Sequence, residues 1–324
     1  MITRRLLLAS AAALAFAAPA FAQEKLNVIA TFSILGDIVT NVGGDRVEVI
    51  SLVGPDGDAH VFQPAPADAQ AVAGAQVIVA NGLGFEGWMD RLVEASGTQA
   101  RLITAADGVT PIAFGEEEHA EEEGHDHDHG HGDDHAEGEE HDHAGHDHGA
   151  FDPHAWQSVT NVALYVGNIE RGLAAADPAG AETYAANAAA YLAELDTLDA
   201  EIRAAVAALP EDRRTVVTSH DAFGYFAADY GLTFIAPQGV STEAEASAQD
   251  VAALITQIRD AGIAAVFVEN IADRRLLDQI ATETGAAIGG TLYSDALSGP
   301  DGPAGTYLAM MRHNLSQLTA ALAN

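Results

Sequence analysis

DPAGAETYAANAAAYLAELDTLDAEIRAAVAALP (residues 177–210) predicts one long helix, which Asp177 can cap, Pro178 can begin and Pro210 ends. Its large apolar residues recur mainly at steps of three and four: Tyr184, Tyr191, Leu192, Leu195, Leu198, Ile202, Val206 and Leu209. At 1.5 Å per residue, a helix over 178–209 would be roughly 48 Å long, which is longer than a single lobe is wide. We therefore expect a rigid helix that joins two separate parts of the chain.

Short apolar runs on both sides of this helix predict strands. They are rich in β-branched residues and are bounded by Gly, Asp or Asn: 26–31, 47–53 and 77–80 before the helix, and 215–218, 232–235, 264–269 and 286–293 after it. Helical periods such as 250–261 lie between them. This alternation predicts an α/β fold with two lobes, each a small and mostly parallel sheet flanked by helices. We expect an N-terminal lobe over 23–177, a linking helix over 178–209 and a C-terminal lobe over 210–324.

The first 22 residues have the features of a secretory signal peptide. Arg4 and Arg5 precede an apolar run over 6–18 that is too short to span a bilayer, and residues 20–22 (AFA) supply a cleavage pattern. We expect cleavage before Gln23 and release into the periplasm; the charged region fits the general and the twin-arginine export routes equally. Because the sequence contains no cysteine, we expect no lipid anchor, no disulfide and no thiolate metal site.

The chain is strongly acidic, with 14 Lys and Arg against 48 Asp and Glu and a formal net charge of −34. Such a charge argues against nucleic acid and against anionic membrane surfaces as partners. Residues 116–149 alone hold 10 of the 14 histidines and 15 of the acidic residues, without Lys or Arg. This tract is too polar to fold, so we expect a disordered loop. His-rich tracts are typical of metal binding, which predicts additional weak zinc sites in the loop, although a solvated spacer is the alternative.

Four potential metal ligands lie outside that tract. His60, His220 and Asp295 each follow a predicted strand, whereas His154 lies where the acidic tract returns to ordinary sequence. Open α/β sheets bind ligands beyond the carboxyl ends of their strands. Two of the four residues precede the linking helix and two follow it, so a site built from all of them would lie in the cleft between the lobes. Three imidazoles and one carboxylate would fill a zinc coordination shell.

Five segments around these residues resemble the signatures of the cluster A-I substrate-binding proteins, which serve ABC transporters for zinc and manganese. They are GPDGDAHVFQPAP (54–66), NGLGFEGW (81–88), FDPHAWQS (151–158), TSHDAFGYFA (218–227) and LYSDALS (292–298). The resemblance covers nearly the whole mature chain, in the right order, and includes the acidic His-rich loop of the zinc members. It implies two lobes joined by one long helix, with the metal held in the cleft.

The resemblance also implies the metal ligands and the partners. The ligand positions of the family carry over to His60, His154, His220 and Asp295. Manganese members generally have Glu where this chain has His220. Many zinc members use water in place of the final Asp, so Asp295 places this chain with the three-His, one-Asp subgroup. This implies a monomeric receptor that captures zinc at one tight site for an inner-membrane ABC permease; a periplasmic zinc chaperone feeds some of the subgroup.

The ligand types support zinc independently, because imidazole suits zinc whereas manganese prefers more oxygen ligands. Copper and nickel also bind imidazole, and the sequence does not exclude them.

Asp58, Asp152 and Asp221 are candidates to accept the second N–H of a ligand histidine, or are only turn and cap residues. Glu86 and Glu269 match family positions but receive no role.

Two other classes of function are less consistent with the sequence. A zinc hydrolase keeps one coordination position open for water, and four protein ligands leave none, so we expect no enzyme. A metal buffer built from 116–149 would need neither two lobes nor a cleft. A buffer would have many similar weak zinc sites, whereas a receptor would have one tight site plus weaker ones. A manganese receptor of the same family is the remaining alternative.

Overall fold

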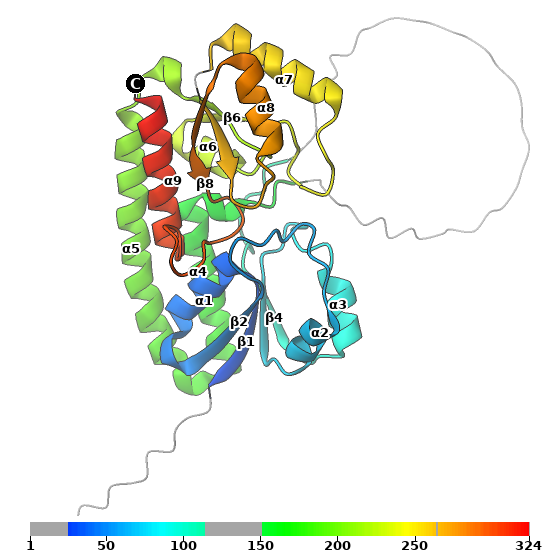
Figure 1. Cartoon of the computed structure of the whole chain (residues 1–324). Helices are drawn as coiled ribbons and strands as arrows, with labels where there is room; N and C mark the ends of the chain where they lie inside the picture. The colour runs from blue at the N-terminus through cyan, green and yellow to red at the C-terminus, as the bar shows by residue number, and fades with distance from the viewer. Residues whose placement is uncertain (1–24, 114–150, 264, 324) are drawn as a thin grey trace, which may run out of the picture.

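The computed structural model describes residues 25–113, 151–263 and 265–323. The predicted signal peptide (1–22) and the predicted disordered loop (116–149) lie outside the described residues. Within the described ranges the chain forms two α/β lobes alongside one long helix (Figure 1). The predicted fold class, with two lobes built on small parallel sheets, is therefore confirmed.

The N-terminal lobe contains a parallel four-stranded sheet with the order β2-β1-β3-β4. Its elements are β1 (Leu26–Phe32), α1 (Ser33–Gly43), β2 (Val47–Val53), α2 (Pro66–Ala73), β3 (Val77–Ala80), α3 (Met89–Ser96) and β4 (Arg101–Thr104). Strand β3 is buried along its whole length, as expected for an apolar strand inside a parallel sheet that is covered on both faces. The edge strand β4 was absent from the sequence-based prediction.

The C-terminal lobe repeats this arrangement with the order β6-β5-β7-β8, again parallel. Its elements are β5 (Thr215–Val217), α6 (Gly224–Tyr230), β6 (Thr233–Ile235), α7 (Ala248–Ala261), β7 (Ala265–Glu269), α8 (Arg275–Thr284) and β8 (Ala287–Leu292). In both sheets the strand order reverses beside the first strand, at β1 and β5. Such a reversal is the point at which open parallel sheets bind ligands.

Helix α4 (Val159–Ala176) packs against the N-terminal sheet, and the long helix α5 (Ala181–Ala207) connects the lobes. Figure 1 shows α5 extending along both lobes, and its 27 residues correspond to about 40 Å. The buried large residues of α5 follow the predicted spacing: Tyr184, Tyr191, Leu195, Leu198, Ile202 and Val206. The helix begins later than 178 because Pro178–Gly180 forms a 3-10 turn and the Asp177 carboxylate pairs with Arg46 and Tyr184 instead of capping α5.

The C-terminal helix α9 (Tyr307–Leu322) lies beside α5 and also reaches the N-terminal lobe (Figure 1). The backbone N–H of Tyr307 donates to Asp37 on α1 over 2.8 Å. Arg312 pairs with Glu201 on α5 at 2.8 Å. The main hydrophobic core is correspondingly continuous from β1 through α4 and α5 to α9, while a smaller cluster lies between the C-terminal sheet and helices α7 and α8. The lobes are thus held together along the side formed by α5 and α9.

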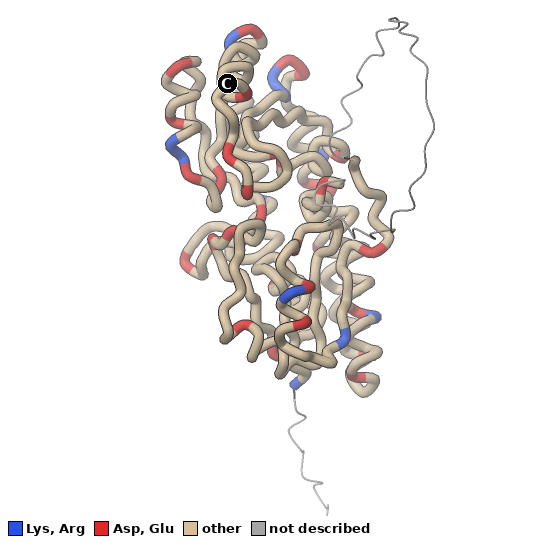
Figure 2. The backbone as a smooth tube through the Cα atoms, turned by 90° about the vertical axis from the view of Figure 1, so that its right-hand side faces the viewer, with Lys and Arg blue, Asp and Glu red and all other residues tan. Residues whose placement is uncertain are grey.

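Acidic residues occur along the backbone of both lobes, whereas Lys and Arg are few (Figure 2). The high negative charge is therefore a property of the folded lobes as well as of the His-rich tract. Among the described residues, no helix combines the length and the apolar character needed to cross a bilayer.

Candidate metal centre

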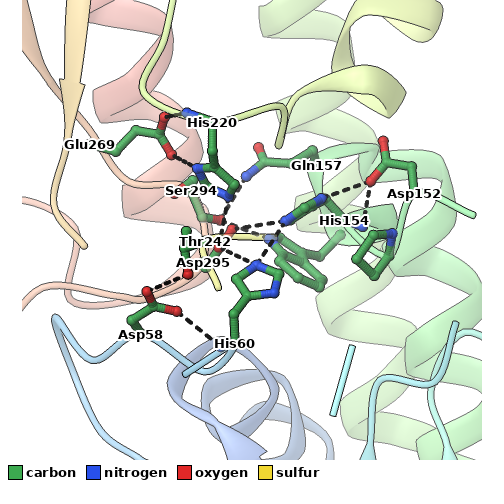
Figure 3. Close-up of polar contacts among 12 residues, drawn as sticks. Asp58, His60, Asp152, His154, Gln157, His220, Thr242, Glu269, Ser294 and Asp295 are labelled. Atoms are coloured by element: carbon green, nitrogen blue, oxygen red, sulfur yellow. Dashed lines mark hydrogen bonds and ion pairs between the residues drawn. The ribbon is translucent and has the colours of Figure 1, made fainter. Parts of the chain in front are cut away.

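Four buried side chains from both lobes meet between the two sheets: His60, His154, His220 and Asp295 (Figure 3). They are the four residues that the sequence singles out. His60 follows β2, His220 follows β5 and Asp295 follows β8, so three of them extend from the carboxyl ends of strands. His154 directly precedes the 3-10 turn Ala155–Gln157, which leads into α4. One potential ligand atom of each residue lies within 4.8 Å of those of the others.

The distances between these atoms fit a four-coordinate ion. Oδ2 of Asp295 lies 3.2 Å from Nε2 of His60 and 3.1 Å from Nε2 of His220. Nε2 of His154 lies 3.4 Å from Nε2 of His60 and 3.6 Å from Oδ1 of Asp295. Bonds of about 2.0–2.2 Å to a tetrahedral zinc ion place ligand atoms about 3.3–3.6 Å apart. These four separations are therefore close to those in a zinc coordination shell, and the remaining ones stay within 4.8 Å.

Carboxylates orient two of the three imidazoles. Nδ1 of His154 lies 2.7 Å from Oδ1 of Asp152, and Nδ1 of His220 lies 2.7 Å from Oε2 of Glu269. A carboxylate on Nδ1 fixes the imidazole tautomer that carries its lone pair on Nε2, and it makes that nitrogen a stronger donor to a metal. Both Nε2 atoms face Asp295, so the lone pairs of the two imidazoles and the carboxylate of Asp295 converge on the same position between the lobes.

The carboxylates next to the cluster only partly match the sequence-based candidates. Asp152 orients a histidine as predicted. Asp58 instead accepts the backbone N–H of His60 and the hydroxyl of Thr242. No histidine of the described chain donates to Asp221, whose backbone N–H bonds to the carbonyl of Gly239.

Glu269 has a role that the sequence-based analysis missed. Besides His220, it accepts the backbone N–H groups of Ser219 and His220 at 2.7 and 3.0 Å. Its position at the end of a predicted strand, like that of His220, was the available signal. Glu86 makes similar bonds away from the cluster: it accepts from Thr31 and from the backbone of Asn81 and Gly82, and so organises the loop after β3.

The charges of the cluster are strongly coupled. Burial opposes protonation of His154, but Asp295 and Asp152 outweigh burial and raise its pKa to about 9. Burial likewise opposes protonation of His220, and Glu269 and Asp295 nevertheless raise its pKa. Burial disfavours the charged form of Asp295, yet the two histidines lower the pKa of this carboxyl. A cation that binds here replaces protons on the imidazoles and takes over the pairing with Asp295.

Trp156 lies beside His154 and connects the two lobes. Its indole N–H donates to the carbonyl of Ser294 over 2.8 Å, directly before Asp295. Its ring lies 5.2 Å from that of His154 and 4.8 Å from that of Phe85. The side chain of Gln157 donates to the same Ser294 carbonyl over 2.7 Å. These contacts position His154 and Asp295 relative to each other across the lobe boundary.

Comparison with known proteins finds relatives that match almost the whole chain. The family model for zinc-uptake complex component A, periplasmic, matches residues 28–321. Iron-binding protein YfeA of Yersinia pestis is 34% identical over 305 residues, which cover 94% of this chain and 88% of YfeA. Manganese-binding lipoprotein MntA of Halalkalibacterium halodurans is 32% identical over 299 residues, which cover 92% of this chain and 89% of MntA.

Solved structures give the same result. The periplasmic zinc-binding protein TroA from Treponema pallidum superposes with a TM-score of 0.79 at 28% identity, covering 93% of this chain and 100% of TroA. The names of these relatives mention iron, manganese and zinc. The comparisons therefore support metal binding and leave the identity of the metal to the chemistry of the site.

Proposed function

Because the chain belongs to the family of zinc-uptake complex component A, whose members are metal-binding proteins of ABC transporters and not enzymes, we propose that it captures one zinc ion between its lobes for import. The observation that carries this proposal is the convergence of three buried imidazoles and one buried carboxylate on a single point. Its family implies a membrane permease as the recipient. One chain supplies all four proposed ligands, which is consistent with a monomer; loading by a zinc chaperone stays a prediction.

Zinc is favoured over manganese and iron by the donor set of His60, His154, His220 and Asp295. Three imidazole nitrogens suit zinc, whereas manganese prefers shells with more oxygen. Four separations between the donor atoms, 3.1–3.6 Å, are close to the edges of a zinc tetrahedron, and zinc readily accepts that geometry because it has no d-electron preference. The names of YfeA and MntA make an iron or manganese receptor the alternative.

We expect one equivalent of zinc to bind with a dissociation constant in the nanomolar range or below, about −12 kcal/mol. Manganese should bind at least roughly a hundredfold more weakly, because it gains less from imidazole donors. Competition titrations against a zinc chelator, together with metal analysis of the protein isolated from periplasm, measure both quantities. Tighter binding of manganese or iron than of zinc would refute the assignment of the metal, and many weak equivalents without a tight one would favour a buffer.

Deleting residues 116–149 should remove only the additional, weaker zinc equivalents. The four proposed ligands lie outside this tract, and the ends of the described chain at Ala113 and Phe151 already pair as an antiparallel bridge. The stoichiometry from isothermal titration of the full-length and deleted proteins tests this expectation. If the deletion abolished the tight equivalent, the tract would have to contribute to the primary site.

We propose that the protein acts in the periplasm after cleavage near Gln23 and carries no lipid. MntA is named a lipoprotein, but attachment of lipid through a lipobox requires a cysteine, and this sequence contains none. Intact-mass analysis of protein from a periplasmic extract should therefore give the mass of a chain that begins at or near Gln23. Retention of residues 1–22, or the added mass of an acyl group, would contradict the proposal.

A further inference from the structure

His60 differs from the other three residues of the cluster in its access to solvent. It is 8% exposed, whereas His154, His220 and Asp295 are fully buried. It also lines two adjacent cavities of about 430 and 350 Å³ that open between the lobes. We call this opening the mouth, and define it by His60, Phe85, Val240 and Glu243. Of the four proposed ligands, only His60 can be reached from it.

His60 is also the least constrained of the three imidazoles. A carboxylate lies 2.7 Å from Nδ1 of His154 and of His220, whereas no carboxylate of the described chain pairs with Nδ1 of His60. Its ring contacts Phe85 edge-on, with the ring centroids 4.9 Å apart. Its Nε2 lies 3.2 Å from Oδ2 of Asp295, and its backbone N–H donates to Oδ1 of Asp58 over 2.9 Å.

The same carboxylate of Asp58 reaches across to the other lobe. Its Oδ2 accepts the hydroxyl of Thr242 over 2.7 Å (Figure 3). Thr242 belongs to the segment between β6 and α7, whose neighbouring residues Val240 and Glu243 line the mouth. One carboxylate therefore connects the backbone of His60 to the C-terminal side of the mouth.

Other contacts between the lobes do not involve Asp58 or Thr242. Trp156 and Gln157 both bond to the carbonyl of Ser294. The backbone N–H of Asp56 donates to the carbonyl of Leu297 over 2.9 Å. Breaking the bond between Asp58 and Thr242 leaves these contacts and the carboxylate partners of His154 and His220 in place, so its loss would loosen only the contact between the loop that carries His60 and the segment between β6 and α7.

We propose that the ion enters and leaves past His60, and that Asp58 and Thr242 are positioning residues whose hydrogen bond sets the rate of this exchange. The inference rests on the proposed function, because it takes His60 to be a metal ligand. Opening the bond frees the segment that lines the mouth beside His60, while the other three ligands stay in place. Because the bond resists passage in both directions, it affects the rates of uptake and release more than the affinity.

The test is a stopped-flow measurement of zinc uptake and of zinc release to a fluorescent chelator, using the full mature chain. Thr242→Val removes the hydroxyl and keeps the shape of the side chain. We expect the rates of uptake and release each to increase roughly tenfold, because this is the effect of losing one hydrogen bond to a charged group. The dissociation constant should change by less than about threefold. Thr242→Ser, which retains the hydroxyl, should restore the original rates. Thr256→Val is the matched control, since that hydroxyl bonds only within α7.

Unchanged rates in Thr242→Val would overturn the proposal, and so would weaker binding with an unchanged rate of uptake. In both of those cases zinc would still occupy one tight site, so the proposed function would stand. Absence of a tight zinc equivalent in the unaltered protein would instead remove the proposed function itself. Thermal unfolding of the variants in the presence and absence of zinc verifies that the fold is intact.

Discussion

Replacing Asp295 with asparagine is expected to weaken zinc binding by roughly three orders of magnitude, about 4 kcal/mol. Asp295 is the only anion within the four-residue cluster, and one of its oxygens lies within 3.2 Å of two imidazole nitrogens. Asparagine keeps the shape of the side chain but provides only a neutral oxygen. The buried zinc ion would then lose its closest compensating charge, which in a poorly solvated site is costly. Competition titration against a high-affinity chelator measures the loss.

Asp301→Asn provides the matched control, because it removes the same charge from an exposed position six residues later. The fold of the Asp295 variant should survive, since Ser294 is held through its backbone carbonyl by Trp156 and Gln157. Circular dichroism verifies this. Equal zinc affinity of the two variants would show that the Asp295 carboxylate does not bind the ion.

Much of the architecture could be predicted because each element has a local signal. The strands at 47–53 and 77–80 have the predicted bounds, since the first is rich in β-branched residues and the second is a continuous apolar run. Strand β4 (RLIT) has no such signal: it begins with a charged residue, and Arg101 and Leu102 are exposed at the sheet edge. The position of α9 could not be predicted either, because its contacts with α1 and α5 join residues far apart in sequence.

The four proposed metal ligands could be predicted from their positions along the chain and from the family resemblance. Their hydrogen-bond partners could be predicted only where the partner is close in sequence. Asp152 is two residues from His154, and this short spacing allows one carboxylate oxygen to bind both the backbone N–H and Nδ1 of the histidine. Asp58 has the same spacing from His60, but its carboxylate binds only the backbone N–H and then Thr242. Glu269, 49 residues from His220, depends on the pairing of β5 with β7, which the sequence does not encode locally.

The substitution of His220 distinguishes a zinc site from a manganese site. His220→Ala should leave three ligands, with water able to fill the gap. We expect zinc to bind about a hundredfold more weakly, roughly 3 kcal/mol. His313→Ala is the control, because it removes a histidine on α9 that bonds only to the carbonyl of Thr291. If the two alanine variants bound zinc equally tightly, His220 would not be a ligand.

Introducing the carboxylate that manganese members carry requires a second change, because of Glu269. Oε2 of Glu269 lies 2.7 Å from Nδ1 of His220, so His220→Glu alone would place two buried carboxylates side by side. We expect that single variant to bind both metals poorly.

In the double variant His220→Glu/Glu269→Gln, the glutamine oxygen still accepts the backbone N–H groups of residues 219 and 220, and its amide donates to the new carboxylate. This variant should bind manganese at least roughly tenfold more tightly than the parent protein and zinc more weakly, since an oxygen replaces an imidazole. Manganese affinity is measured by electron paramagnetic resonance and zinc affinity by chelator competition; if the double variant gained no manganese affinity, the third ligand would not control the choice of metal.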